Sequence, residues 1–256
     1  MILQAHPDGL VAIAQSAHAL VAFHIAAHWG NRTTPHLSPR SEVLAAVLLH
    51  DAGWDDREEP PRLSPNGLPI AFDTLPDEER EALWTAAVER AVPRGRYVEY
   101  LVSHHVAHLA GFSTHHSHTA FLAREQERQR RLRGELERDA RFRQCFSTGV
   151  DELNRAVVRI TDALAVHLCR AGSGTIHIAS LPHREGPVPL RVNQEIEHTY
   201  RLHPWPLVGR RLELHAEGRR LPGSSFADEA ELRRAWADGK TVSLRWILLP
   251  QGAQRD

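Results

Sequence analysis

The chain has few cysteines and no long apolar run, and each scarcity excludes a class of protein. Two cysteines among 256 residues, Cys145 and Cys169, are too few for a disulfide framework, and neither belongs to a CxxC metal motif. The apolar stretch near the N-terminus is interrupted by His18, His24 and His28, which argues against a signal peptide and a membrane span. Such a chain fits a reducing compartment, so we expect a cytoplasmic protein.

The chain also lacks an excess of charge of either sign. Its 31 Lys and Arg residues stand against 32 Asp and Glu residues, so the formal net charge is −1. No overall field attracts nucleic acid or a membrane surface, and neither is an expected partner. The segment 124–143 is rich in arginine, but glutamates recur in it at helical spacing, which predicts a solvated helix with salt bridges.

Histidine, by contrast, is abundant. The chain has 18 histidines, most of them before residue 120, in a composition that is otherwise ordinary for a globular protein. Because imidazole is the commonest metal ligand among side chains, this excess indicates metal chemistry.

Hydrophobic periodicity divides the chain into a helical part and a strand-rich part. Apolar residues at helical spacing predict helices at 9–28, 39–51, 76–92, 96–110 and 150–170. After the Gly/Ser segment 171–174, short alternating runs predict strands, with one helix near 228–237. We therefore expect a mainly α protein with an all-helical domain over residues 1–171 and a small β-rich domain over 175–256.

The most informative pair is His50 and Asp51. They close the apolar run 45–49 and precede a Gly53-Trp54 turn, so an imidazole and a carboxylate stand where a helix meets the core. A pair of this kind is typical of one corner of a metal site, provided that other corners exist.

Three residues on other predicted helices are the candidates for the remaining ligands. His18 has Ala14 and Ala22 one turn away on either side, so it faces the interior. His105 points at an apolar seam of its helix, and Asp162 has valines one turn away in both directions. Because an unpaired buried carboxylate is costly, Asp162 requires a cation or a set of donors.

The donor types determine the chemistry that we expect. Imidazoles and carboxylates together suit a divalent Fe, Mn, Zn or Co ion. Two His and two Asp ligands leave coordination positions open for water and substrate, as catalytic sites do. The predicted metal ligands are His18, His50, Asp51, His105 and Asp162, a set that leaves both one ion and two ions open.

The order of these residues resembles the HD-domain superfamily of metal-dependent phosphohydrolases. The motifs that carry the likeness are Ser16-Ala17-His18-Ala19-Leu20, Leu49-His50-Asp51-Ala52-Gly53-Trp54, Val102-Ser103-His104-His105 and Arg159-Ile160-Thr161-Asp162-Ala163-Leu164. More narrowly, the chain is similar over nearly its whole length to a bacterial family designated domain of unknown function 3891. That likeness rests on Gln15-Ser16-Ala17-His18, His28-Trp29-Gly30, the turn after His50 and Leu202-His203-Pro204-Trp205-Pro206-Leu207.

The superfamily resemblance implies an HD-domain-like helical bundle and a divalent metal on His18, His50, Asp51 and Asp162. It also implies hydrolysis of a phosphate ester or nucleotide. The narrow family carries no established reaction. Because the wider superfamily includes di-iron oxygenases and metal-free regulatory proteins, two alternatives stay open: a non-haem di-iron oxygenase and a non-catalytic ligand-binding module.

For a hydrolase, we expect Asp51 to hold the metal and orient its water. Asp55 or Asp56, in the turn that follows, is a candidate to support a metal ligand or to donate a proton, and His104 or His108 is expected to face the substrate or to support a ligand. The expected partner is a small phosphorylated molecule, and the sequence is compatible with a homo-oligomer. The arginines expected near its phosphate, by proximity in the chain, are Arg32, Arg40 and Arg57.

Overall fold

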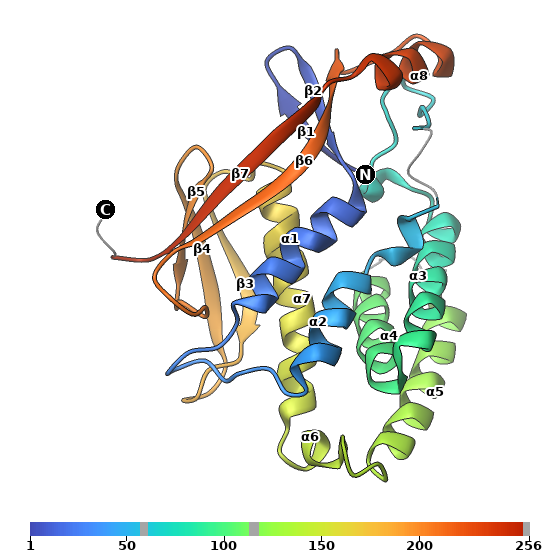
Figure 1. The fold of residues 1–256 in the computed structure, drawn as a ribbon. Coiled ribbons are helices and arrows are strands. Elements are labelled where there is room, and N and C mark those ends of the chain that lie inside the picture. The colour runs from blue at the N-terminus through green and yellow to red at the C-terminus, as the bar shows by residue number, and fades with distance from the viewer. Residues whose placement is uncertain (57–60, 113–117, 253–256) are drawn as a thin grey trace.

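A computed structural model gives the fold of the protein (Figure 1), and it describes residues 1–56, 61–112 and 118–252. The molecule consists of one mixed β-sheet and a group of helices that packs against it. The strands are β1 (Ile2–His6), β2 (Gly9–Ile13), β3 (Thr175–Leu181), β4 (Val188–Ile196), β5 (Thr199–His203), β6 (Leu212–Pro222) and β7 (Thr241–Pro250).

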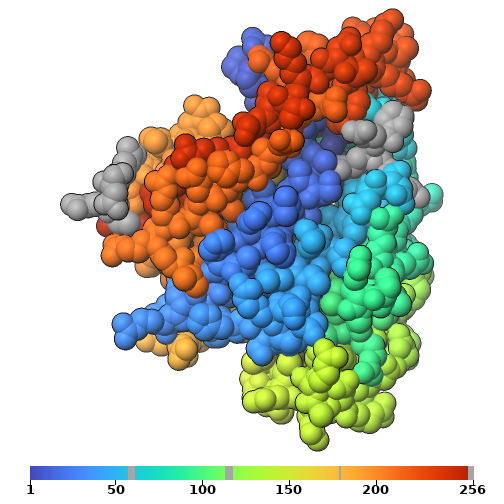
Figure 2. Space-filling view, viewed as in Figure 1, coloured from blue at the N-terminus to red at the C-terminus, as the bar shows by residue number. Residues whose placement is uncertain are grey.

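The seven strands lie in the order β1-β2-β6-β7-β5-β4-β3. All neighbouring strands are antiparallel except β5 and β7, which are parallel. The sheet therefore joins the first residues of the chain to its last third, through the pairing of Leu10 with Leu221 and of Ala12 with Arg219. In Figure 2 the N-terminal segment, in dark blue, lies beside the orange and red strands that follow residue 210.

The predicted helix at 9–28 is wrong over its first part, because residues 9–13 form β2. Gly9 has a φ of +140°, and a Cβ at this position would lie 2.2 Å from the carbonyl oxygen of Leu221, so the turn into β2 requires glycine. The apolar residues of so short a run fit either a helical or an extended pattern. Pairing with β1 on one side and β6 on the other selects the strand, and the helix begins only at Gln15.

The other predicted helices of the first 170 residues are present, and so is the one near 228–237. The helices are α1 (Gln15–Ala27), α2 (Arg40–Leu49), α3 (Asp77–Ala91), α4 (Arg96–Gly111), α5 (Thr119–Leu136), α6 (Arg143–Ser147), α7 (Val150–Cys169) and α8 (Glu229–Asp238), with single 3₁₀ turns η1 (Ala52–Trp54), η2 (Phe72–Thr74) and η3 (Val92–Arg94). The arginine-rich segment forms α5 and carries the expected intrahelical ion pairs, such as Arg131 with Glu135. Within the described residues, no helix is both long and apolar enough to span a membrane.

A single hydrophobic core joins the helices to the sheet. It includes Ile25 of α1, Leu101 of α4 and Leu164 of α7 together with Leu190 of β4 and Trp246 of β7. Helix α1 contacts α2 and α7 on one side and β6 on the other. The expected fold, an HD-domain-like helical bundle followed by a small β-rich domain, is therefore wrong. The N-terminal hairpin brings the sheet against the helices, so α1 packs on both, while Ser16, Leu20 and His24 remain exposed on its outer face.

Candidate metal centre

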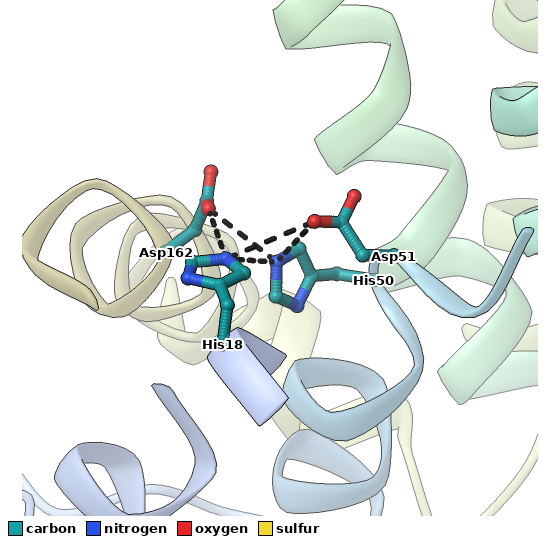
Figure 3. Close-up of side chains that lie close together, drawn as sticks. All are labelled: His18, His50, Asp51 and Asp162. Carbon is teal, nitrogen blue, oxygen red and sulfur yellow. Dashed lines mark hydrogen bonds and ion pairs between the residues drawn. The ribbon is translucent and has the colours of Figure 1, made fainter. Parts of the chain in front are cut away.

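Four side chains from three segments converge in the interior (Figure 3). His18 comes from α1, His50 and Asp51 follow the last residue of α2, and Asp162 comes from α7. One potential ligand atom from each residue lies within 4.8 Å of all the others. The Nε2 atom of His18 is 3.0 Å from Oδ1 of Asp162, 3.2 Å from Nε2 of His50 and 3.7 Å from Oδ2 of Asp51.

The end of α2 and the turn that follows it position His50 and Asp51. Helix α2 ends just before His50, whose Nδ1 lies 2.6 Å from the carbonyl oxygen of Val47. In the tautomer whose Nδ1–H donates to this carbonyl, the lone pair of Nε2 points at the cluster, which is the orientation of a metal ligand. The turn after Asp51 packs closely on α3, because a Cβ on Gly53 would lie 2.0 Å from the carbonyl oxygen of Leu83.

The charges of the cluster compensate one another. Burial lowers the pKa of His50, but the carboxylates of Asp51 and Asp162 outweigh this effect and raise it to about 9. Burial raises the pKa of Asp51. Burial also opposes ionisation of Asp162, yet hydrogen bonds from His18 and His50 hold the pKa of Asp162 well below its usual range. His18 and His50 form ion pairs with both carboxylates and His105 forms one with Asp162, while the positive N-terminus also acts to lower the pKa of Asp51.

This donor set fits a divalent cation. Two imidazoles and two carboxylates are the ligands that Fe, Mn, Zn and Co accept. A bound cation would take the place of the protons that the histidines of the cluster now share with its carboxylates. The residues that would hold it are His18, His50, Asp51 and Asp162.

A pocket of about 200 Å³ reaches two of these side chains, Asp51 and Asp162. Most of its remaining wall is apolar and much of it aromatic, formed by Trp54, Phe72, Leu83, Trp84, Leu109, Phe112 and Val166. A small molecule in this pocket would therefore contact both carboxylates of the cluster and pack its apolar part against aromatic rings.

A second cavity, of about 340 Å³, adjoins the first pocket at Asp162. It shares Asp162, Leu109 and Phe112 with the first pocket, and adds His105, His108 and Arg159. Asp162 thus faces both spaces, one largely aromatic and one that contains histidines and an arginine.

The family of the chain follows from sequence comparison. Residues 1–223 match the family described as "Protein of unknown function (DUF3891)". The chain belongs to the DUF3891 family. The match contains all four residues of the cluster and ends just after β6, and it confirms the narrower of the two resemblances. No curated protein and no solved structure matches the chain.

In this DUF3891 protein, His105 adjoins the four convergent residues without joining them. Its Nε2 is 3.5 Å from Oδ2 of Asp162, and its ring lies edge-to-face with that of His50 at 4.9 Å between centroids. Burial lowers the pKa of His105 to about 3, so its imidazole is neutral. Neither ring nitrogen has a hydrogen-bond partner among the described residues.

Two other predicted residues lie away from the cluster. The carboxylate of Asp55 forms an ion pair with Arg90 at 2.8 Å, and Asp55 lines neither cavity. His104 packs its ring against Tyr100, 4.5 Å between centroids, and it also lines neither cavity. Burial, together with nearby arginines, lowers the pKa of His104 to about 3. Of the histidines proposed to face substrate, the structure brings His108 to the second cavity.

Two of the arginines expected near a phosphate line neither of the two spaces. Arg32 is exposed, and Arg40 donates a hydrogen bond to the carbonyl of Ala27. Arg57 lies outside the described residues. Other arginines line the two spaces: Arg80 lines the first pocket and donates a hydrogen bond to the carbonyl of Leu75, and Arg159 lines the second cavity. Arg159 is one helical turn before Asp162, and this spacing of three residues is the signal that could have identified it.

Proposed function

We propose that this DUF3891 protein is a cytoplasmic metal-dependent hydrolase of a small phosphate ester or nucleotide. Its ligands would be His18, His50, Asp51 and Asp162, the set that the HD-domain resemblance implies. The observation that supports the proposal is the convergence of four donor atoms within 4.8 Å beside a pocket large enough for a small molecule.

A divalent ion bound to these residues would lower the pKa of a bound water to about 7 and polarise a phosphoryl oxygen. The protein's own groups prepare the site for this reaction. The Val47 carbonyl fixes the ring of His50, and the buried His18 holds Asp162 in place by a 3.0 Å hydrogen bond. Asp51, at the pocket wall, is placed to orient a water molecule, and the aromatic wall limits access of bulk water.

Two other functions use the same residues and are tested by the same experiment. A di-iron oxygenase requires a second ligand set, and His105, 3.5 Å from the far oxygen of Asp162, is the residue that favours it. A non-catalytic module would bind its ligand in the same pocket without turnover.

The test is the metal content per chain, measured by plasma mass spectrometry on protein purified without added metal and without a histidine tag. The hydrolase predicts about one equivalent of Fe, Mn, Zn or Co in wild type and none in Asp51→Asn. The matched control is Asp55→Asn, which removes an acid four residues later that pairs with Arg90, and it should keep the metal. A screen of phosphate esters and nucleotides should then show hydrolysis that a chelator abolishes.

Each other outcome contradicts the proposal in a recognisable way. Two equivalents and oxygen consumption with an organic substrate would indicate the oxygenase. Metal bound equally by Asp51→Asn would show that the ion lies elsewhere, and no metal in any variant would indicate the non-catalytic module.

A further inference from the structure

Arg159 is a cation without a partner inside the second cavity. It lies on α7, is half-buried, and forms no hydrogen bond or ion pair with the residues that the structure describes. Burial and the neighbouring Arg155 lower the pKa of the Arg159 guanidinium, which shows that its charge is poorly compensated. Arg155 itself is engaged with Asp151 at 3.1 Å. A partly buried charge in this position favours an anionic ligand.

Two histidines add donors to the same cavity. His105 is 2 % exposed, and both of its ring nitrogens are buried with no hydrogen-bond partner among the described residues. Buried polar atoms without a partner are rare, so a ligand is a natural partner for them. His108, one turn further along α4, lines the cavity beside Arg159. Since an imidazole carries at least one N–H group, the cavity offers two ring donors and one guanidinium fork.

The second cavity and the aromatic pocket meet at the metal centre. Both are lined by Leu109, Phe112 and Asp162. A ligand placed at Asp162 can therefore extend in two directions, toward Arg159 or toward the rings of Trp54 and its neighbours. The two spaces differ in chemistry. The second holds Arg159, which has no partner among the described residues, whereas the first is lined mostly by flat apolar groups, and its Arg80 is engaged with the carbonyl of Leu75 and with Asp77.

We infer that the ligand is a phosphate monoester of an apolar, flat alcohol, with its phosphoryl group against Arg159, His105 and His108 and its organic group in the aromatic pocket. This inference names the substrate class of the proposed hydrolase and rests on that function for its chemistry. In the reaction, the oxygen of water bonds to phosphorus and the ester P–O bond breaks. One proton of the water leaves with the alcohol, and the other stays on the phosphate.

The arginine explains why a phosphoryl group fits this position. A guanidinium presents two parallel N–H donors that match two oxygens of a phosphate, and such charge-assisted bonds are stronger than neutral ones. Because Arg159 and Asp162 are one turn apart on α7, a single phosphoryl group can lie beside both the arginine and the metal ligands.

The experiment measures binding rather than turnover, by calorimetric titration of the purified protein with inorganic phosphate and with phenylphosphonate, whose C–P bond resists hydrolysis. Arg159→Gln should weaken the binding of both ligands by about 10- to 100-fold, the usual loss for a hydrogen-bonded charge. The matched control is Arg94→Gln, which removes an exposed arginine just before α4 and should change either affinity less than about twofold. Arg159→Lys keeps the charge without the fork and should fall between wild type and Arg159→Gln.

A second variant tests the aromatic half. Wild type should bind phenylphosphonate more tightly than phosphate, and Trp54→Ala should abolish this preference while leaving phosphate binding unchanged. Equal affinity of wild type for the two ligands would overturn the assignment of the aromatic pocket.

The inference and the proposed function fail in different ways. Equal phosphate binding by Arg159→Gln and Arg94→Gln, or no phosphate binding by wild type, would overturn the anion site even if the protein hydrolyses phosphate esters. If Arg159→Gln loses phosphate binding and the wild-type protein hydrolyses no phosphate ester, the result would support the anion site and contradict the hydrolase. Circular dichroism of each variant establishes that the losses do not arise from unfolding.

Discussion

Addition of Mn²⁺ should stabilise the folded protein, and replacement of Asp162 by Asn should remove most of this effect. Asp162 lies at the middle of the cluster, with its oxygens 3.0 Å from His18, 3.4 Å from His50 and 3.5 Å from His105. The amide of Asn has nearly the same shape as the carboxylate but no charge. Mn²⁺ is the useful probe because it binds most weakly of the divalent first-row ions to ordinary sites, so the many surface histidines will bind little of it.

The magnitude follows from mass action. At a concentration 100 times the Kd, a ligand that binds only the folded state stabilises it by about 2.7 kcal/mol. For a chain of this size, a change of 1 kcal/mol shifts the Tm by about 2–4 °C, so the expected increase is about 5–11 °C. A variant with a 100-fold weaker site would gain about 0.4 kcal/mol at the same Mn²⁺ concentration, which corresponds to about 1–2 °C.

The assay is thermal unfolding followed by circular dichroism, with and without Mn²⁺ after treatment with a chelator. Asp55→Asn is the control, because its carboxylate pairs with Arg90 outside the cluster, and it should show the full wild-type increase. An equal increase in Asp162→Asn would refute the reasoning, since the ion would then bind without its central ligand.

Three further predictions concern the rest of the fold. All three tyrosines have raised pKa values because they are buried, to about 12 for Tyr100 and Tyr200. Unfolded tyrosines ionise near pH 10, so stability should fall as pH rises from 10 toward 12, and phenolate absorbance at pH 10.5 in protein with native circular dichroism would contradict this. Burial raises the pKa of Cys169 to about 12, so this thiol should not react with a thiol reagent at pH 8 until the protein unfolds. Gly53→Ala should lower the free energy of unfolding by about 1–3 kcal/mol, because its Cβ would clash with α3. Gly134→Ala, in open space on α5, should raise it by about 0.5–1 kcal/mol, and urea titration measures both changes.

The helices were predictable where local signals agree. The acidic first turn of α3, which begins at Asp77, and the apolar faces of α4 and α7 each indicate one structure. The sheet was not predictable in the same way. The turn Pro7-Asp8-Gly9 does indicate a local hairpin of β1 with β2, but the other partner of β2, strand β6, lies more than 200 residues later. Such pairing depends on tertiary contacts that no local window contains.

For the candidate site, too, local features were predictable and contacts between distant segments were not. The periodicity of each helix predicts that His18, His105 and Asp162 face inward, because each helix has a face set by its own apolar neighbours. The packing of one helix against another decides which inward residues meet. That is why Asp55 pairs with Arg90 away from the cluster, and why Arg159, although only one turn from Asp162, is not among the predicted site residues.

The pairing of β2 with β6 ties the candidate metal centre to a part of the chain that is synthesised about 200 residues after β2. Helix α1, which carries His18, follows β2 after a single residue, and β2 is held in the sheet by residues 219–221. During synthesis these partners emerge when the segment that contains all four cluster residues is already outside the ribosome. Closing so long a loop is slow because its entropy must be lost before the new contacts form. We therefore expect the nascent chain to acquire its helices early and to complete the His18 corner only after β6 has been released.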